Sequence, residues 1–295
     1  MIAKKMTGDI DGREFKFNVE IFNGANELID VCESRTRNPS FYEDTFGDEK
    51  CDGGWVGCKT MTEVKGYCRG NWDEKVPTVK EMIRNIQKNI PTNKPMFHND
   101  VAGFAPVVPL VLARVPNSMI NCHVEPKKSR VLDVYYDATM GCGNGPDVLI
   151  EMGMKAVEYI LRAEAQGYRV RLTAVQMYYN NGSADVLMVR IKNENQPLNI
   201  QRMMFPMFHP AFFRVIGFGW YERCPTSKHR GGYGHSMAYD YDVKEMNRMF
   251  EGMLGKQAIY LSAVHIQEVH EMHGETKDEA RSRLVKDTLK MEAQV

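Results

Sequence analysis

The sequence has no surplus of either charge. Its 38 Lys and Arg residues are balanced by 38 Asp and Glu residues, so the formal net charge is zero. A protein whose main partner is nucleic acid usually carries an excess of basic residues, because phosphate contacts dominate the affinity. The charge balance therefore does not indicate a nucleic-acid partner.

Long apolar runs are also missing. No stretch reaches the roughly 18 consecutive apolar residues that a membrane-spanning helix needs. The first residues, MIAKKMTGDIDGREF, lack the apolar segment of a secretory signal. We therefore expect a cytoplasmic protein without a membrane partner.

The cysteines and histidines do not form a recognised metal or disulfide pattern. The seven cysteines are odd in number and include no C-x-x-C pair, so we expect free thiols. His265, His270 and His273 depart from the H-E-x-x-H spacing of a zinc site, and we expect them to be exposed. We also expect His229 and His235 to lie in a solvated loop.

Residues 131–179 contain the strongest structural pattern. The run VLDVYYD at 131–137 is almost continuously apolar, which is typical of a strand buried on both faces of a parallel sheet. A glycine-rich loop follows, and then apolar residues at intervals of three and four predict a helix from Pro146 to about Gly167. Residues 169–179 predict a second strand, which completes a βαβ unit.

Further elements follow from local signals. Asn181-Gly182 predicts a hairpin, so a strand at 184–191 should run antiparallel to its predecessor. Residues 101–116 are apolar but interrupted by proline, and we expect irregular chain that packs across the core. Residues 212–222 are compatible with a strand or a kinked helical piece. The other expected elements are strands at 13–22 and 258–266, helices at 26–34, 57–71, 79–89, 198–205, 243–254 and 276–293, and an acidic surface loop at 35–55.

These elements predict an α/β fold. We expect an open, mostly parallel sheet with one antiparallel hairpin strand, flanked by helices. An α+β N-terminal region should occupy residues 1–125, and the α/β core residues 126–295.

The order of strand, long helix, strand, antiparallel strand, helices, strand and terminal helix resembles the von Willebrand factor type A fold. In that fold an aspartate ending the first strand opens a metal loop of the form D-x-S-x-S. Asp137, Thr139 and Gly141 stand at the corresponding positions, with threonine for the first serine and glycine for the second. The resemblance therefore implies an incomplete metal site. The wider sequence also resembles an uncharacterised family of bacteriophage-encoded proteins, which implies no established activity.

The loop after residue 137 is the candidate site on physical grounds as well. Ligands of open α/β sheets collect at the carboxyl ends of the strands. Asp137 and Thr139 offer the hard oxygen ligands that suit Mg²⁺, and Asn144 and Asp147 lie on the same rim. The alternative is that Asp137 only braces the loop. Cys142, close to a helix start, is the best-placed nucleophile but lacks an assigned base.

The sequence favours a phage-encoded protein–protein interaction or assembly protein that binds a phage or host protein through the rim from Asp137 to Asp147. The acidic loop should lie beside this rim. A Mg²⁺-dependent hydrolase or nucleic-acid processing enzyme using Asp137 is the competing hypothesis, and a thiol enzyme comes third. The expected location is the host cytoplasm, with the virion left open.

Overall fold

The computed structural model describes residues 1–10, 12–70, 72, 74–90, 96–123, 130–141, 146–180, 182–228, 236–255 and 257–271. The expected helix at 276–293 lies outside these residues.

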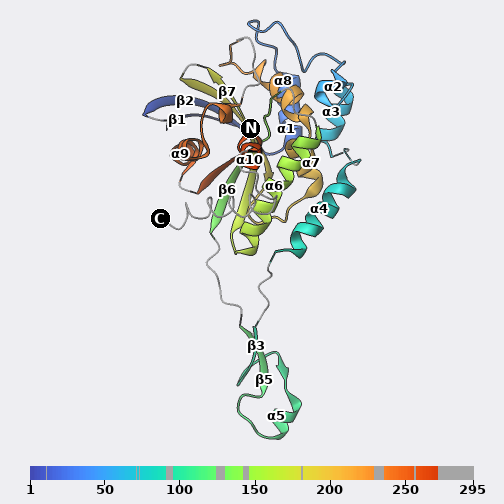
Figure 1. Cartoon of the computed structure of the whole chain (residues 1–295), viewed down its shortest axis with the longest axis vertical. Helices are drawn as coiled ribbons and strands as arrows, with labels where there is room; N and C mark the ends of the chain where they lie inside the picture. The colour runs from blue at the N-terminus through green and yellow to red at the C-terminus, as the bar shows by residue number, and fades with distance from the viewer. Residues whose placement is uncertain are drawn as a thin grey trace.

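The body of the protein is built on a six-stranded sheet with the strand order β1-β2-β8-β7-β6-β9 (Figure 1). Its strands are β1 (Ile2–Ile10), β2 (Arg13–Phe22), β6 (Val131–Asp137), β7 (Arg169–Asn180), β8 (Ser183–Lys192) and β9 (Ala258–Ser262). Strand β6 is parallel to β7 and β9, and β2 is parallel to β8. Strand β8 is antiparallel to β7, and Gly182 in the turn between them has a φ of 79°. The predicted mixed α/β fold with a mostly parallel sheet is therefore confirmed.

One strand was not predicted. Strand β1 is antiparallel to β2 and forms an edge of the sheet. Its residues are mostly exposed and polar, so they lack the alternation that marks a half-buried strand. The division of the chain at residue 125 stays a prediction, and the sheet extends across it because β2 pairs with β8.

Helices cover both faces of the sheet. Helix α9 (Val243–Leu254) covers one face, where Phe250 packs against Tyr135 of β6 and Tyr260 of β9. Asp242 caps this helix together with Glu245, as predicted. Tyr136 points to the opposite face because successive residues of a strand alternate in direction. The opposite face is covered by α6 (Pro146–Ala165) and α7 (Ile200–Phe208), which pack against each other.

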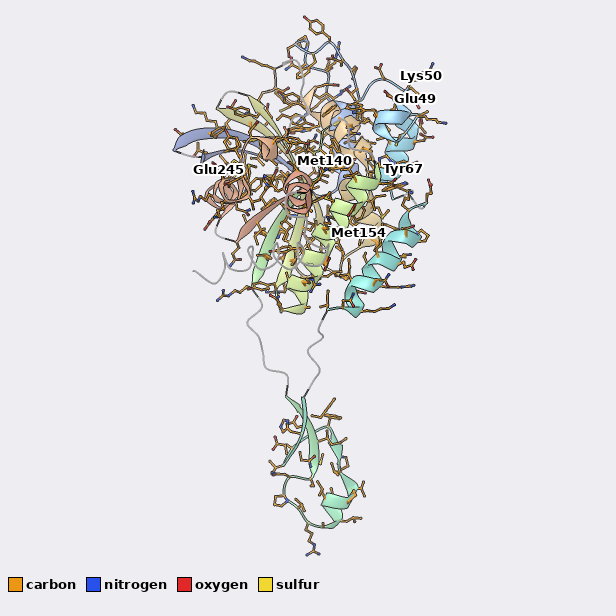
Figure 2. The ribbon with its side chains drawn as sticks, in the orientation of Figure 1. Glu49, Lys50, Tyr67, Met140, Met154 and Glu245 are labelled. Atoms are coloured by element: carbon orange, nitrogen blue, oxygen red, sulfur yellow. The ribbon has the colours of Figure 1, made fainter. Side chains whose placement is uncertain are left out.

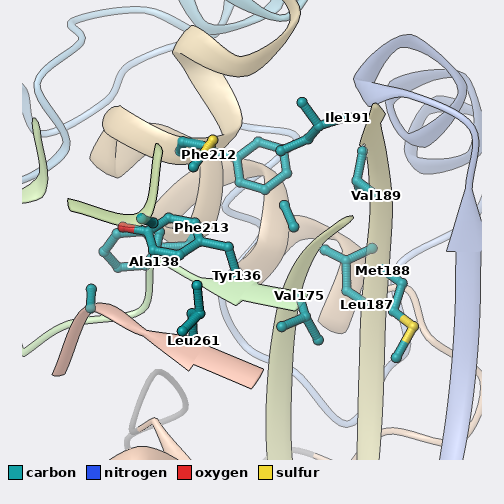
Figure 3. Packing of buried hydrophobic residues seen from close by; sticks show 14 of the residues in the cluster. Tyr136, Ala138, Val175, Leu187, Met188, Val189, Ile191, Phe212, Phe213 and Leu261 are labelled. Atoms are coloured by element: carbon teal, nitrogen blue, oxygen red, sulfur yellow. The ribbon is translucent and has the colours of Figure 1, made fainter. Parts of the chain in front are cut away.

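The segment that the sequence left open between strand and helix is helical. It forms a π-helical turn (Phe212–Gly217) followed by α8 (Phe218–Tyr221). Figure 3 shows Phe212 and Phe213 of this turn near Tyr136 and Ala138. Arg214 of the same turn is buried and donates to the backbone oxygens of Trp55 and Gly141. The turn therefore ties the N-terminal region to the loop that follows β6.

The N-terminal helices are α1 (Ala25–Ser34), α2 (Gly53–Val56), α3 (Met61–Cys68) and α4 (Val76–Lys88). Helix α3 starts later than predicted, because Thr60 and Glu63 form a capping box there. The capping box predicted at Thr78 and Glu81 is wrong, since α4 already begins at Val76 without a side-chain cap. Helices α6 and α4 are in contact, so α4 belongs to the same layer.

The acidic loop at 35–55 is more than a solvated surface loop. Phe41 and Phe46 are buried in the core, and Asp52 caps α2. Asp44 forms an ion pair with Arg223, and Glu49 accepts a hydrogen bond from Thr62. These contacts hold the loop against the body.

Residues 96–123 form a separate small sheet, which we call the arm. Its elements are β3 (Met96–Asp100), β4 (Ala105–Pro106), α5 (Val108–Leu112) and β5 (Met119–His123), with the strand order β3-β5-β4. The prediction that 101–116 packs across the core is wrong, because these residues lie in the arm and none of them is buried. Figures 1 and 2 show the arm and its side chains apart from the body. Antiparallel pairing with β5 holds this proline-interrupted segment in the arm.

The chain after the π-helical turn closes the fold. It contains a short 3₁₀-helix η2 (Met237–Tyr239) and, directly after β9, helix α10 (Ala263–Glu271). The strand expected to continue to residue 266 ends at Ser262, whose hydroxyl accepts the Val264 N–H. No helix in the described part of the chain is both long and apolar enough to cross a membrane.

Candidate functional site

Asp137 ends β6 and is held by hydrogen bonds at both carboxylate oxygens. Oδ1 accepts the backbone N–H of Thr139 at 2.8 Å. Oδ2 accepts the hydroxyl of Tyr260 at 2.7 Å and that of Ser236 at 3.2 Å. The side chain of Asp137 is 1% exposed. We call Asp137, Thr139, Ser236 and Tyr260 the Asp137 cluster.

The sheet register explains how this cluster forms. Strands β6 and β9 are parallel neighbours, and Asp137 pairs with Ser262 at their carboxyl ends. Tyr260 lies two residues earlier on β9, on the same face as Asp137. Ser236 precedes η2, and its hydroxyl also accepts the N–H of Ala238. Three separate segments thus meet where the sequence placed its candidate site.

Burial controls the protonation of the cluster. It raises the pKa of the Asp137 carboxyl, while hydrogen bonds from Thr139, Tyr260 and Ser236 act in the opposite direction. The pKa of Tyr260 is raised well above its usual value, first by burial and then by the neighbouring Asp137 charge. The hydroxyls therefore keep their protons and serve as donors. This arrangement braces the loop that follows β6.

The predicted site residues are only partly brought together. Thr139 lies beside Asp137 and is 2% exposed. Asp147 is exposed in the first turn of α6, where a carboxylate favours the helix dipole. Asn144 and Cys142 lie outside the described residues. The described part of the chain holds no group of three or more His, Cys, Asp or Glu side chains placed to bind a metal ion. The roles assigned to Asp137 and Thr139 with Mg²⁺ remain predictions.

Sequence reasoning missed Ser236 and Tyr260. Ser236 lies in a segment whose glycines and histidines predict only a loop. Tyr260 lies in a strand whose neighbour in the sheet the sequence does not indicate. The β-branched and aromatic content of residues 258–266 predicts a strand there, but not the burial of this tyrosine. Its contact with Asp137 follows only once β9 is placed beside β6.

A cysteine and a histidine that sequence reasoning did not connect meet in the core. Cys58 Sγ lies 3.8 Å from His209 Nε2, although the residues are 151 positions apart. His209 Nδ1 accepts the N–H of Ala211 at 3.1 Å, so Nε2 carries the ring proton and points it at the sulfur. Burial raises the pKa of Cys58 to about 12 and lowers that of His209 to about 4. A nucleophilic thiol needs the reverse of both shifts, so this is a structural pair.

The histidine expectations are corrected at one position. His265 is buried rather than exposed, and its Nε2 lies 2.8 Å from the carbonyl oxygen of Tyr241. It lies in helix α10, which packs on α6 and η2, and this packing explains the burial. Outside the described part of the chain lie His229, His235 and His273, together with the side chain of His270.

A polar cavity of about 590 Å³ lies at the other end of the sheet, near the carboxyl ends of β2 and β8. Among the residues that line it are Asn23, Glu27, Arg69, Asn199 and Arg202. Several of these groups already have partners: Arg202 donates to the Asn23 carbonyl, and Glu27 accepts the Asn23 N–H. Asn199 caps α7. The lining is therefore largely a set of internal contacts.

The fold and the Asp137 cluster define a mixed α/β protein with a mostly parallel six-stranded sheet flanked by helices. The sheet carries a buried, hydrogen-bonded carboxylate at the end of the inner strand β6. The chain belongs to the family described as Domain of unknown function (DUF7192), whose model matches residues 10–291. Neither the curated proteins nor the solved structures contain a match to this chain.

Proposed function

We propose that this protein is a protein–protein interaction or assembly protein, and that it binds through the arm. Seven of the twelve exposed large hydrophobic residues in the described part of the chain lie in the arm. Leu112 is 78% exposed and Phe104 is 67% exposed. Exposed apolar side chains that gather in one place are typical of a binding surface. This concentration is the observation that carries the proposal.

The rim at Asp137 is less suited to protein contact than the sequence suggested. Asp137 and Thr139 are buried, which leaves Asp147 as the exposed residue of the described rim. In the acidic loop, Asp44 is paired with Arg223 and Asp52 caps α2. A partner would therefore meet few unengaged groups there, whereas the arm presents apolar surface directly.

The proposal includes a von Willebrand A-like core and a phage origin. Support for such a core comes from the order of elements β6, α6, β7, antiparallel β8 and β9, with an aspartate ending β6. A phage-encoded protein of this kind would act in the host cytoplasm or in the virion, and its partner would be a phage or host protein.

A Mg²⁺-dependent hydrolase or nucleic-acid processing enzyme at Asp137 finds less support. Both carboxylate oxygens accept hydrogen bonds from buried donors, which a metal ion would have to displace. Calorimetric titration with Mg²⁺ of the wild type and Asp137→Ala separates the two hypotheses. Binding to the wild type that disappears in the variant would favour the enzyme.

Photo-crosslinking tests the role of the arm. A benzophenone amino acid replaces Phe104 or Leu112 in the arm, and Tyr42 or Tyr179 on the body serves as the matched exposed control. On irradiation in the cells that produce the chain, we expect both arm positions to give the same single protein adduct and both body positions to give none. Absence of an arm adduct, or equal adducts from arm and body, would contradict the proposal.

A further inference from the structure

Resting on the proposed function, we infer that the partner of the arm is the arm of a second copy of this chain. Two arms would pair edge to edge along β3 across a twofold axis, with their apolar side chains in contact, and hold two bodies together. Four observations support this choice of partner: charge, area, the surface of the body and the free edge of the arm sheet.

The arm carries almost no charge. Between residues 96 and 123 the only Lys, Arg, Asp or Glu residues are Asp100 and Arg114, which have opposite signs. A strongly charged partner would find no complementary surface here. Two copies of a neutral, apolar arm meet without repulsion between like charges.

The arm has enough exposed apolar side chains to form an interface between two copies. A standard specific interface buries roughly 800 Å² per partner, and seven exposed large side chains supply much of that area. These side chains are Phe97, Val101, Phe104, Val108, Val111, Leu112 and Val115. An isologous contact uses the same patch on both copies, so one arm supplies the whole surface that the other needs.

The described body offers no comparable surface to receive an arm. Its exposed large hydrophobic residues belong to four separate segments and include three tyrosines: Met1, Ile2, Tyr42, Tyr179 and Tyr239. Single exposed residues of this kind are ordinary on a protein surface. Among the described residues of a second copy, the arm is therefore the apolar surface that is large enough to cover this arm.

The arm also lacks a core and has a free edge. No residue between 97 and 121 is buried, and a small sheet without a packed face is marginal on its own. Within the arm sheet, β3 pairs with β5 alone, which leaves its other edge without a strand among the described residues. Antiparallel pairing of β3 with β3 of a second copy would join the two sheets into one and bring the apolar side chains of both arms side by side.

Sedimentation velocity over a range of protein concentrations tests this inference. The samples are the wild type, the double variant Phe104→Glu/Leu112→Glu, and Tyr179→Glu as a control on the exposed body. We expect a dimer for the wild type and the control. The dissociation constant of the double variant should rise at least about thirtyfold, because charges replace the two most exposed large apolar side chains of the arm.

The outcomes separate this inference from the proposed function. Circular dichroism should show an intact body in the double variant, since no residue between 97 and 121 is buried against the body. A monomeric wild type at micromolar concentration, or a dimer that survives the double variant, overturns the inference. If the arm then still crosslinks to a different protein, the proposed function stands; if it crosslinks to nothing, both fall.

Discussion

His209 should make the stability of this protein fall between pH 6.5 and pH 4. Its side chain is 6% exposed and lies at the C-terminal cap of α7, with its ring edge-on to Trp72 at 4.6 Å. Burial lowers the pKa of His209 from 6.5 to about 4. Above pH 6.5 the imidazole is neutral in both the folded and unfolded chain, so it adds no pH dependence. Below that pH only the unfolded chain takes up the proton.

The size of the effect follows from proton linkage. Between the two pKa values the unfolded state binds more protons than the folded state, so the free energy of unfolding decreases as the pH is lowered. The loss from this one group should be about 2 kcal/mol at pH 5 and about 3 kcal/mol at pH 4. It should level off below the folded pKa, where both states are protonated.

Urea unfolding at several pH values between 7 and 4, for the wild type and His209→Asn, measures this contribution. The asparagine oxygen can replace Nδ1 as the acceptor for the Ala211 N–H, but the side chain does not titrate. The variant loses ring packing at every pH, so the readout is the change with pH of the difference between the two proteins. A difference that stays constant would refute the reasoning, as would an NMR titration that gives His209 a pKa near 6.5.

Two further predictions concern packing and the Asp137 cluster, each measured by urea unfolding. Gly153→Ala should lower the free energy of unfolding by roughly 1–3 kcal/mol, because the new Cβ would lie 2.3 Å from the Phe208 ring. In Gly252→Ala on α9 the new Cβ meets open space, so this variant should be more stable than the wild type by about 0.5–1 kcal/mol. Equal effects of the two changes would contradict this packing. Asp137→Ala should lower the free energy of unfolding by roughly 3 kcal/mol or more, because it leaves three buried donors unpaired. Asp137→Asn should lower it less, because the hydroxyls of Ser236 and Tyr260 can rotate and accept hydrogen bonds from the asparagine amide. An alanine variant as stable as the wild type would instead point to a carboxylate kept for a ligand.

The sequence predicted those parts of the fold that depend on local patterns. The unit β6-α6-β7 and the hairpin to β8 follow from an apolar run, a helical period and a tight turn, and all are present. Strand β1 has no such pattern, because an exposed edge strand needs no apolar face. The arm was misplaced for the opposite reason: Phe104 and Leu112 are as apolar as core residues, and composition does not say whether such residues face a core or a partner.

The candidate site was located but its chemistry was not predictable. The position of Asp137 follows from the end of an apolar strand, which sequence periodicity identifies well. Its burial depends on Tyr260, 123 residues away, and on Ser236, 99 residues away. Such contacts are set by the order of strands in the sheet. A single sequence indicates that order only weakly, so a carboxylate bound by hydroxyls looks the same as one that binds a metal.

The first and last residues of the arm are paired with each other, since Met96 lies opposite His123 across β3 and β5. The chain therefore enters and leaves the arm at neighbouring positions. An insertion of this kind can lengthen, shorten or disappear during evolution while the register of the six-stranded sheet is unchanged. Related proteins can then share one body and differ in the arm, and an engineer can exchange the arm as a cassette.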